Sequence, residues 1–357
     1  MSRVPGYGAC PSAVERSAVP RDFTKEWKIL RLSRILRSAS IGLTVVLTAT
    51  GLVTISHVSG TLAATASAGN SSAQWTVLRK KLQPVLDDAA GHHVILGISA
   101  RSLAGPHTNQ SLDMGSMGPY KAASTIKLGL ASLLMKGVDD GKWTFDTKVT
   151  VKPEDLVGGS GTLQKEGKSA FPQSITLDRL MRLMITVSDN TATNVLIDFV
   201  GGFDPINRFT QSLGLSDSGF HFGRKMILPH PPEQENWISP AEDAELLKMI
   251  YRSIFISKAA SSQIISWMRQ QQVNTKFGAV IPRDDLANKT GENTDVSHDT
   301  GYLLVPGHET VLSVMTSFNP ADFPDWNTAF ATANAEVQKV AKVVYDYLRN
   351  SAPAPAQ

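Results

Sequence analysis

The sequence predicts an α/β protein of the α+β type, in which terminal helices flank a mainly antiparallel sheet and an all-helical lobe is inserted. Three observations predict it. A helical pattern over Trp75–Ala90 leads into strand-like alternation over His93–Leu103. Helical patterns then dominate Ser124–Tyr251, and strand patterns return after Lys289, before a last helix over Ala335–Leu348. Because each amphipathic element must bury its apolar face, we expect two packed lobes with a cleft between them.

The two terminal helices are indicated by apolar residues at three- and four-residue spacing, which form one stripe along a helix. These residues are Leu78, Leu82, Val85 and Leu86 in the first helix, and Val337, Val340, Ala341, Val344 and Tyr347 in the last. A chain of 357 residues with 42% hydrophobic composition can bury such a core, and we expect one domain over residues 73–350. The Pro/Ala-rich segment 351–357 is expected to be a disordered tail.

The helix expected after Ser124 is almost entirely apolar up to Val138, which predicts a central, buried position. Residues 124–127 read Ser-Thr-Ile-Lys, and a spacing of three places Ser124 and Lys127 on one helix face. A serine hydroxyl is a weak nucleophile that needs a neighbouring base, and a lysine can serve if burial and a second cation lower its pKa. Ser124 therefore has two interpretations, a catalytic nucleophile or a helix N-cap.

Two further helices are expected on either side of a short break at residues 186–190, which contains the sequence Ser-Asp-Asn at 188–190. Ser188 would lie on a loop and present its hydroxyl to the cleft. The side chain of Asn190 is placed to hydrogen-bond a substrate amide. Asp189 has a simpler interpretation, because aspartates in such turns satisfy nearby backbone donors.

The third short motif, Lys-Thr-Gly, begins at Lys289 and is followed by strand-like runs at 301–305 and 309–316. An edge strand beside the cleft would let Lys289 supply positive charge for a substrate carboxylate. Thr290 would add a hydroxyl donor, and Gly291 would let a ligand approach the backbone closely.

Acyl-transfer chemistry also needs hydrogen-bond donors for the developing oxyanion. If Ser124 begins its helix, its amide is one of the unpaired N-terminal donors, and the helix dipole favours negative charge there. The backbone amide of Glu292, just after the glycine, is the second candidate donor.

The motifs occur in the order Ser-x-x-Lys, Ser-Asp-Asn, Lys-Thr-Gly, which is the signature of class A β-lactamases and penicillin-binding proteins. Over Ala73–Asn350 the chain resembles this family of penicillin-recognising serine hydrolases, including the residues that flank the motifs. The resemblance implies the DD-peptidase/β-lactamase fold. It also implies the following roles: Ser124 is the acylated nucleophile, Lys127 and Ser188 relay its proton, Asn190 and Lys289 position the substrate, and the amides of Ser124 and Glu292 form the oxyanion hole.

One departure from the family concerns the Ω-loop. The family carries there a glutamate that activates water for hydrolysis of the acyl-enzyme, but its expected place, residues 224–226, reads Arg-Lys-Met. The same loop contains Glu233 and Glu235 as candidate bases for deacylation, and three prolines between residues 229 and 232 imply a different loop shape. We expect neither glutamate to replace the missing base. Acylation with slow product release, or acyl transfer to another acceptor, would follow.

The eight histidines and the single cysteine are not arranged as a metal site. Cys10 stands alone, and no His-x-x-x-His pair occurs, so we expect neither a metal nor another cofactor. His298 lies near the place of an arginine common in the family. It would either help to hold a substrate carboxylate or cap a strand, and the second role is the more frequent for a lone histidine.

The first 72 residues are expected to direct export. Residues 1–37 form a tail with eight basic and three acidic residues, and residues 38–72 contain no charged side chain. The apolar stretch 41–58, preceded by arginines, is typical of a signal peptide or a membrane anchor. Either form places the hydrolase domain outside the cytoplasm, secreted or anchored to the membrane. The remaining 27 basic and 29 acidic residues leave no basic excess, which argues against nucleic-acid binding.

We therefore predict an exported, monomeric serine hydrolase that opens a β-lactam amide through a Ser124 acyl-enzyme. Its partner would be a small-molecule β-lactam or a peptidoglycan peptide. A first alternative is a D-Ala-D-Ala peptidase or transpeptidase, or a penicillin-binding protein of slow turnover, because these use the same acylation chemistry. A second alternative is a non-catalytic cell-wall-binding module. Such a module has no need of a base, so the presence of Lys127 argues against it.

Overall fold

The computed structural model describes residues 64–351, with side chains from residue 75 onward. The described residues all belong to one compact unit. The predicted basic tail, 1–37, and the apolar stretch 41–58 lie outside the described residues, as do residues 352–357 of the predicted C-terminal tail. Within the described part, none of the helices combines the length and the apolar character that a membrane crossing requires.

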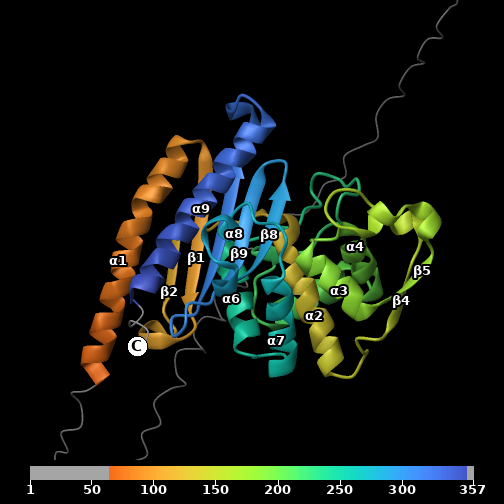
Figure 1. Cartoon of the computed structure of the whole chain (residues 1–357), viewed down its shortest axis with the longest axis horizontal. Coiled ribbons are helices and arrows are strands. Elements are labelled where there is room, and N and C mark those ends of the chain that lie inside the picture. Colours follow the sequence, from red (N-terminus) through yellow and green to blue (C-terminus); the bar gives the residue numbers. More distant parts are fainter. Residues whose placement is uncertain (1–63, 352–357) are drawn as a thin grey trace, which may run out of the picture. The chain divides into compact units, whose positions relative to one another are not determined.

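A five-stranded antiparallel sheet forms the first lobe, with the strand order β2-β1-β10-β9-β8 (Figure 1). The strands are β1 (Val94–Ser102), β2 (Ser111–Gly115), β8 (Leu286–Asn293), β9 (Val296–Leu303) and β10 (Thr310–Phe318). β10 pairs with β1 over its whole length, so strands from the two ends of the domain meet at the centre of the sheet. The predicted α+β class with a mainly antiparallel sheet is confirmed.

The terminal helices α1 (Ala64–Gly91) and α9 (Trp326–Ser351) lie side by side on one face of this sheet (Figure 1). Their apolar stripes pack on the strands in one buried cluster, which includes Leu78, Leu82, Ile98, Val314, Val337 and Val340. Both helices begin earlier than the apolar stripes predict. In α9 the reason is a cap, since the Asp325 carboxylate accepts a hydrogen bond from the Thr328 amide at 2.8 Å.

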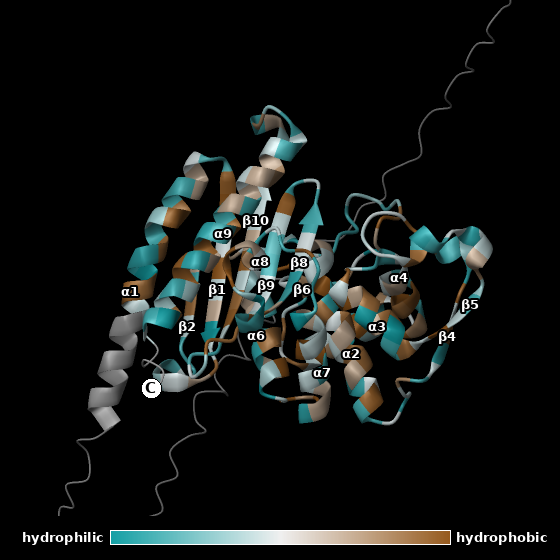
Figure 2. Cartoon of the chain, in the orientation of Figure 1, coloured by the Kyte–Doolittle hydropathy of each residue, from teal (hydrophilic) through white to brown (hydrophobic). Residues whose placement is uncertain are grey.

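The second lobe is helical, as predicted, and its central helix is α2 (Lys127–Asp139). Around α2 lie α3 (Leu177–Thr186), α4 (Asn190–Phe199), α5 (Phe203–Ser212) and α7 (Lys258–Arg269). Leu128, Leu130 and Leu134 of α2 are fully buried, which matches the hydrophobic colouring of this lobe in Figure 2. The helix α6 (Pro240–Tyr251) covers the other face of the sheet by packing on β1 and β10.

Short elements complete the two lobes. β3 (Tyr120–Lys121), β7 (Trp237–Ile238) and β6 (Phe220–His221) form one small sheet, β4 (Lys148–Val151) and β5 (Gln173–Thr176) form another, and α8 (Phe277–Val280) precedes β8. The predicted nucleophile segment enters α2 directly after β3. The fold thus places the start of the central helix α2 beside the edge strand β8, which is in contact with the turn that precedes α2.

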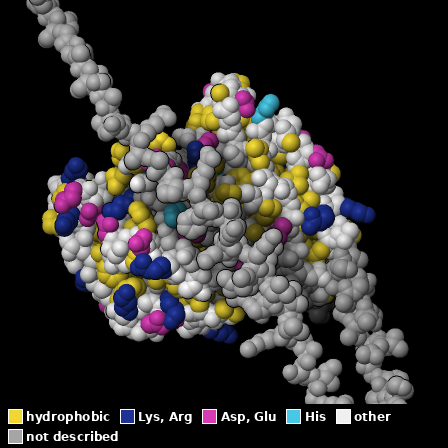
Figure 3. Space-filling view, turned by 180° about the vertical axis from the view of Figure 1, so that it is seen from behind, with side chains coloured by type: hydrophobic (Ala, Val, Ile, Leu, Met, Phe, Trp, Pro, Cys, Tyr) yellow, Lys and Arg dark blue, Asp and Glu magenta, His cyan; other side chains and the backbone are white. Residues whose placement is uncertain are grey.

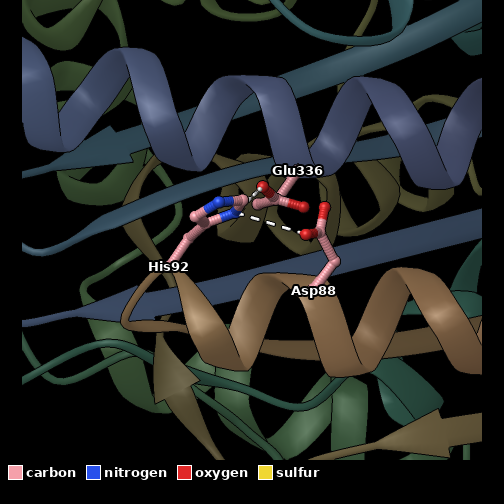
Figure 4. Close-up of side chains that lie close together, drawn as sticks. All are labelled: Asp88, His92 and Glu336. Atoms are coloured by element: carbon pink, nitrogen blue, oxygen red, sulfur yellow. Dashed lines mark hydrogen bonds and ion pairs between the residues drawn. The ribbon is translucent and has the colours of Figure 1, made fainter.

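A cluster of ionisable side chains joins α1 to α9 (Figure 4). His92 Nδ1 lies 2.9 Å from the carboxylate of Glu336, and Asp88 is adjacent. Lys339 donates to Asp88 at 2.5 Å and to Glu336 at 2.8 Å, and its hydrogen bond holds the pKa of Asp88 below the ordinary value. Because an ammonium already bridges the two carboxylates, we interpret the cluster as an interhelix ion-pair network rather than a metal site.

The surface of the described residues carries both signs of charge. Basic and acidic side chains are intermingled on the face shown in Figure 3. Several pairs are local, one helical turn apart, such as Arg208 with Asp204 and Lys342 with Asp346. Exposed pairs of this kind each contribute little to stability.

Candidate active site

Ser124 lies in a tight turn that opens α2. Residues Ala123–Ile126 form a 3-10 turn that continues directly into the helix. Ala123 has a φ of 46°, in the left-handed region that residues other than glycine rarely adopt, and strain of this kind clusters at functional sites. The turn leaves Ser124 partly exposed at the wall of a cavity, whereas Lys127 is fully buried. The Ser124 amide lies in the first turn, where N–H groups lack an intrahelical acceptor.

The Lys-Thr-Gly strand β8 packs against this turn. A Cβ atom on Gly291 would lie 3.0 Å from both the amide nitrogen and Cγ2 of Thr125, closer than ordinary contact. The sequence predicts close approach of a ligand at Gly291, but in the structure the near neighbour is the turn that holds Ser124. Glu292, the next residue of the strand, lines the same cavity as Ser124. The two residues that carry the predicted oxyanion donors therefore line one cavity.

Hydrogen bonds connect the three motifs. Lys127 Nζ donates to the Ser188 carbonyl oxygen at 2.7 Å, to Ser188 Oγ at 3.1 Å and to Asn190 Oδ1 at 2.9 Å. Lys289 Nζ donates to the same Ser188 Oγ at 2.9 Å and to the Thr290 carbonyl oxygen at 2.8 Å. When Lys127 is protonated, Ser188 Oγ accepts from both amines and its own proton is available to a third group. The Ser188 hydroxyl is therefore suited to proton transfer.

The surroundings of the two lysines favour their neutral forms. Burial, followed by the nearby charge of Lys289, lowers the pKa of Lys127 well below its ordinary value, although the charge of Asp189 acts in the opposite direction. Burial also lowers the pKa of Lys289 to about 7; the charge of Asp299 opposes this effect and that of Lys276 adds to it. A neutral Lys127 keeps two N–H donors for the Ser188 carbonyl oxygen and Asn190 Oδ1, and its lone pair can then accept the proton of the Ser188 hydroxyl.

Asp189 anchors the loop that forms the rim of the cavity. Its carboxylate accepts hydrogen bonds from the amides of Thr162 at 2.6 Å, Leu163 at 3.0 Å and, as the N-cap of α4, Ala192 at 2.9 Å. The rim approaches so closely that a Cβ on Gly161 would lie 2.4 Å from this carboxylate. These contacts favour the structural interpretation of Asp189, which orients its two neighbours in the motif.

The predicted substrate-binding residues are not equally accessible. Asn190 lines the cavity, although its Oδ1 accepts from Lys127 and its Nδ2 donates to the Gly158 carbonyl oxygen at 3.1 Å. Lys289 and Thr290 are 0% and 4% exposed, and Lys289 is engaged with Ser188. Contact of these two side chains with a substrate carboxylate stays a prediction.

His298 is fully buried, and both its ring nitrogens are engaged. Nδ1 accepts from the Thr316 amide at 3.0 Å, and Nε2 donates to the Lys121 carbonyl oxygen at 2.8 Å. Burial lowers the pKa of His298 to about 4, so the ring is neutral near pH 7. Of the two roles predicted for His298, these contacts favour the structural one, in which the ring holds neighbouring strands together. They do not favour binding of a substrate carboxylate.

The loop between residues 224 and 235 is closed by a buried ion pair. Arg224 Nε donates to Glu235 Oε1 at 2.5 Å, and the two side chains are only 11% and 7% exposed. The same oxygen accepts from the Asn236 amide at 2.7 Å. Glu235 lines the cavity that contains Ser124, but its Oε1 is held in the ion pair that closes the loop. Glu233 lines a separate hollow and is not brought to Ser124.

Met226 occupies the wall where a deacylating carboxylate is expected from the resemblance. Its side chain is 5% exposed and lines the cavity with Ser124. The side chain of Asn194 fixes its backbone from both sides, accepting from the Met226 amide at 2.7 Å and donating to the Met226 carbonyl oxygen at 3.0 Å. Among the described residues, the carboxylates that line this cavity belong to Glu235 and Glu292, and both are in ion pairs.

Comparisons with known proteins identify the family to which the chain belongs. Residues 77–348 match the family model described as the Beta-lactamase enzyme family. The chain belongs to this family. The extended-spectrum β-lactamase PER-1 of Pseudomonas aeruginosa is 22% identical over 292 residues, which cover 79% of this chain and 90% of PER-1. Family membership confirms the predicted resemblance and the predicted class, a serine hydrolase of the β-lactamase type.

Solved structures similar to this β-lactamase-family protein include PBP-A. PBP-A is 26% identical with a TM-score of 0.65, and the match covers 77% of this chain and 97% of PBP-A. A mutant of PBP-A, solved as an acyl-enzyme complex with penicillin G, is 25% identical with the same TM-score and coverage. The chain is therefore similar both to a named β-lactamase, PER-1, and to PBP-A.

Sequence reasoning missed the residues that shape the loop of this β-lactamase-family protein. Arg224 and Glu235 are 11 positions apart, and Asn194 lies 32 positions from Met226. Neither pair forms a periodic pattern in the sequence. The prolines between Arg224 and Glu235 indicate an irregular loop, but the ion pair that closes the loop leaves no signal in the sequence.

Loss of the ion pair between Arg224 and Glu235 is expected to destabilise the protein. Arg224→Gln leaves the buried Glu235 carboxylate without its cation, which we expect to cost about 3 kcal/mol in the free energy of unfolding. Urea unfolding followed by circular dichroism measures this quantity. The double variant Arg224→Gln/Glu235→Gln should lose less than the sum of the two single losses. Strict additivity would contradict the pairing.

The electrostatic coupling of the two lysines predicts a shift in pH dependence. If Lys127 is the base for acylation, as the motifs predict, the acylation rate should fall as the pH decreases through the pKa of Lys127. Lys289→Gln removes a neighbouring positive charge and raises the pKa of Lys127. The acid limb of the pH–rate profile should therefore move to higher pH by about one pH unit. Pre-steady-state acylation rates between pH 5 and pH 9 measure it. Lys121→Gln, which removes a cavity cation outside the motifs, is the control and should leave the limb in place.

Proposed function

We propose that this protein opens β-lactam amides by forming an acyl-enzyme at Ser124, and that it hydrolyses this acyl-enzyme slowly. The observation that supports acylation most directly is the hydrogen-bonded group of Lys127, Ser188 and Lys289 beside the turn that carries Ser124. The slow second step is supported by the cavity wall, where Met226 stands and both lining carboxylates are paired.

In the proposed acylation, neutral Lys127 accepts the proton of the Ser124 hydroxyl, directly or through Ser188. Ser124 Oγ then attacks the carbonyl carbon of the lactam. The amides of Ser124 and Glu292 stabilise the negative charge that develops on the carbonyl oxygen. The C–N bond breaks as the Ser188 hydroxyl donates its proton to the leaving nitrogen, and Lys127 returns a proton to Ser188. The lactam ring is now open, and its acyl group is esterified to Ser124.

In the second step, water must attack the ester, and a base must accept a proton from that water. Glu235 is bound by Arg224 and the Asn236 amide, and the side chain of Glu292 is bound by Lys276. Both carboxylates are held through Oε1 by a cation, which orients them toward that partner and disfavours a role as general base. The proposal therefore gives the acyl-enzyme a long lifetime compared with its rate of formation.

A D-Ala-D-Ala peptidase or transpeptidase is the second candidate function. It is favoured by the same cavity wall, because a long-lived acyl-enzyme permits transfer to an amine instead of water. The similarity to PBP-A is consistent with this candidate. A purely binding role for the cell wall is not favoured, since two fully buried lysines with lowered pKa values serve chemistry rather than binding.

We also propose that the catalytic domain acts outside the cytoplasm, either secreted or anchored to the membrane, and as a monomer. The placement outside the cytoplasm is supported by the order of arginines followed by the uncharged apolar stretch at residues 41–58. Fractionation of cells that express the full chain, with immunoblotting of the membrane and soluble extracytoplasmic fractions, tests this placement.

Intact-protein mass spectrometry with benzylpenicillin over time tests the proposed chemistry. We expect a mass increase equal to one intact penicillin within minutes, persisting for much longer than it takes to form. An adduct that disappears rapidly while penicilloate accumulates would overturn slow deacylation but support a β-lactamase. An unmodified protein with Ser124 intact would overturn the acyl-enzyme itself.

A further inference from the structure

Three exposed hydrophobic side chains surround the cavity that contains Ser124. Within the described residues, six large hydrophobic side chains are more than two-fifths exposed, and three of them, Ile227, Leu228 and Trp326, line this cavity. Their exposures are 57%, 41% and 49%. Exposed apolar groups gathered at one hollow indicate a binding surface, whereas scattered ones need no explanation.

Trp326 forms one wall on a rigid support. It is the first residue of α9, and the Asp325 cap holds that helix end. Its ring lies 4.3 Å from that of Phe330, with 32° between the planes, and Phe330 in turn makes an edge-to-face contact with the buried Phe318 at 5.6 Å. The indole is thus the outer member of an aromatic stack that reaches into the core, and it presents a fixed apolar surface to the cavity.

Ile227 and Leu228 come from the loop that contains Met226. Ile227 has a φ of 66°, which is unusual for a β-branched residue, and Asn194 fixes the preceding residue on both sides. A Cβ atom on Gly159 would lie 3.1 Å from Ile227 Cδ1 and 2.8 Å from Asn190 Nδ2. The Ile227 side chain and the Asn190 amide therefore adjoin the same point of the rim. This places the apolar loop wall next to a motif residue.

The charges around the cavity do not favour a charged occupant at its mouth. Arg224 is paired with Glu235, Lys121 with Asp295, and Glu292 with Lys276. The cavity has a volume of about 580 Å³, which is within the range of sites for small molecules. It thus combines a polar end at Ser124 with an apolar mouth built from two different segments.

We propose, on the basis of the function proposed above, that this cavity selects substrates with a bulky apolar substituent, aromatic or branched aliphatic, beside the amide that Ser124 attacks. The substituent lies between the loop residues Ile227 and Leu228 and the Trp326 ring. Small or charged substituents leave this surface in contact with water and gain nothing from it. The rigid support of Trp326 means that little side-chain freedom is lost on binding.

Acylation rates with two penicillins test the proposal. Benzylpenicillin carries an aromatic acyl substituent, and 6-aminopenicillanic acid has the same nucleus with a bare amine. We expect the wild-type protein to be acylated by benzylpenicillin at least 10-fold more efficiently than by 6-aminopenicillanic acid. Trp326→Ala should reduce this ratio about 10-fold by slowing benzylpenicillin alone, and Trp326→Phe should restore most of it.

The controls separate this proposal from the proposed function. Ile254→Ala removes an apolar side chain that is 64% exposed but lies outside the cavity, and it should leave the ratio unchanged. Leu228→Ala provides an independent variant on the loop wall and should lower the ratio. Equal acylation by both penicillins in the wild type would overturn the subsite and leave the acyl-enzyme standing. Acylation by neither would overturn the proposed function instead.

Two other results would overturn the subsite. One is an equal loss with both penicillins in Trp326→Ala, which would mean that Trp326 supports the fold of the site rather than the substituent. The other is a wild-type dimer in analytical ultracentrifugation that Trp326→Ala converts to a monomer without a change in the penicillin ratio. In that case a second copy of the chain, rather than a substrate, covers the apolar mouth.

Discussion

Ser124→Ala is expected to abolish the covalent penicillin adduct while leaving the fold intact. The hydroxyl is the nucleophile of the proposed mechanism, and no neighbouring group can replace it, so the acylation rate should fall by at least about 10⁴-fold. Intact-protein mass spectrometry after prolonged incubation with benzylpenicillin measures the loss. Ser124 is partly exposed, and no hydrogen bond of its side chain closes the turn, so the free energy of unfolding should change by no more than about 0.5 kcal/mol.

The stability measurement decides between the two interpretations of Ser124. A helix cap would make the alanine variant about 1 kcal/mol less stable. In the structure, the hydroxyl that bonds within this turn is that of Thr125, which donates to the Ala122 carbonyl oxygen at 2.7 Å. Thr125→Ala is therefore the matched variant, and it should lose stability but keep the adduct. The reverse result, a stable Thr125→Ala and an unstable Ser124→Ala, would make Ser124 a structural residue.

The parts of the site that could be predicted from the sequence are those carried by short motifs. Ser124 and Lys127 are joined by helix periodicity, which a spacing of three reveals directly. The meeting of Lys127 with Ser188 and Lys289 depends on tertiary packing, and it could be predicted only because the order of the three motifs resembles a known family. At Gly291 the motif predicts space for a ligand. In the structure, the position requires a small residue because the turn at Thr125 lies against it.

The parts that could not be predicted depend on contacts without a sequence period. Nothing in the pattern around Met226 indicates that Asn194 fixes its backbone, because a side-chain amide can satisfy any backbone segment that folding brings near it. The early start of α9 was missed for a related reason. Its first turn begins at the exposed Trp326 and depends on a cap, whereas the prediction placed the helix over Ala335–Leu348 from its apolar stripe.

Introducing a carboxylate at the Met226 wall is expected to shorten the life of the acyl-enzyme. Met226→Glu places an acid in the cavity wall beside Ser124, and the two Asn194 hydrogen bonds involve only the backbone of residue 226, so they can persist. A positioned general base typically contributes 10²–10⁴-fold to a rate, and we expect deacylation to become about 10²-fold faster. The decay of the benzylpenicillin adduct after removal of free drug, followed by mass spectrometry, gives this rate directly.

Met226→Gln is the control that distinguishes base catalysis by the new carboxylate from a general loosening of the loop. Met226→Gln has nearly the same size and polarity as the glutamate variant but cannot accept a proton from water, so its adduct should persist as in the wild type. The deacylation rate of Met226→Glu should also rise with pH through the pKa of the new carboxyl, because only the ionised form is a base. If both variants accelerated deacylation equally, the long lifetime of the wild-type acyl-enzyme would result from the closed loop rather than from the missing base. No acceleration in a folded Met226→Glu variant would mean that the water for deacylation does not bind at this wall.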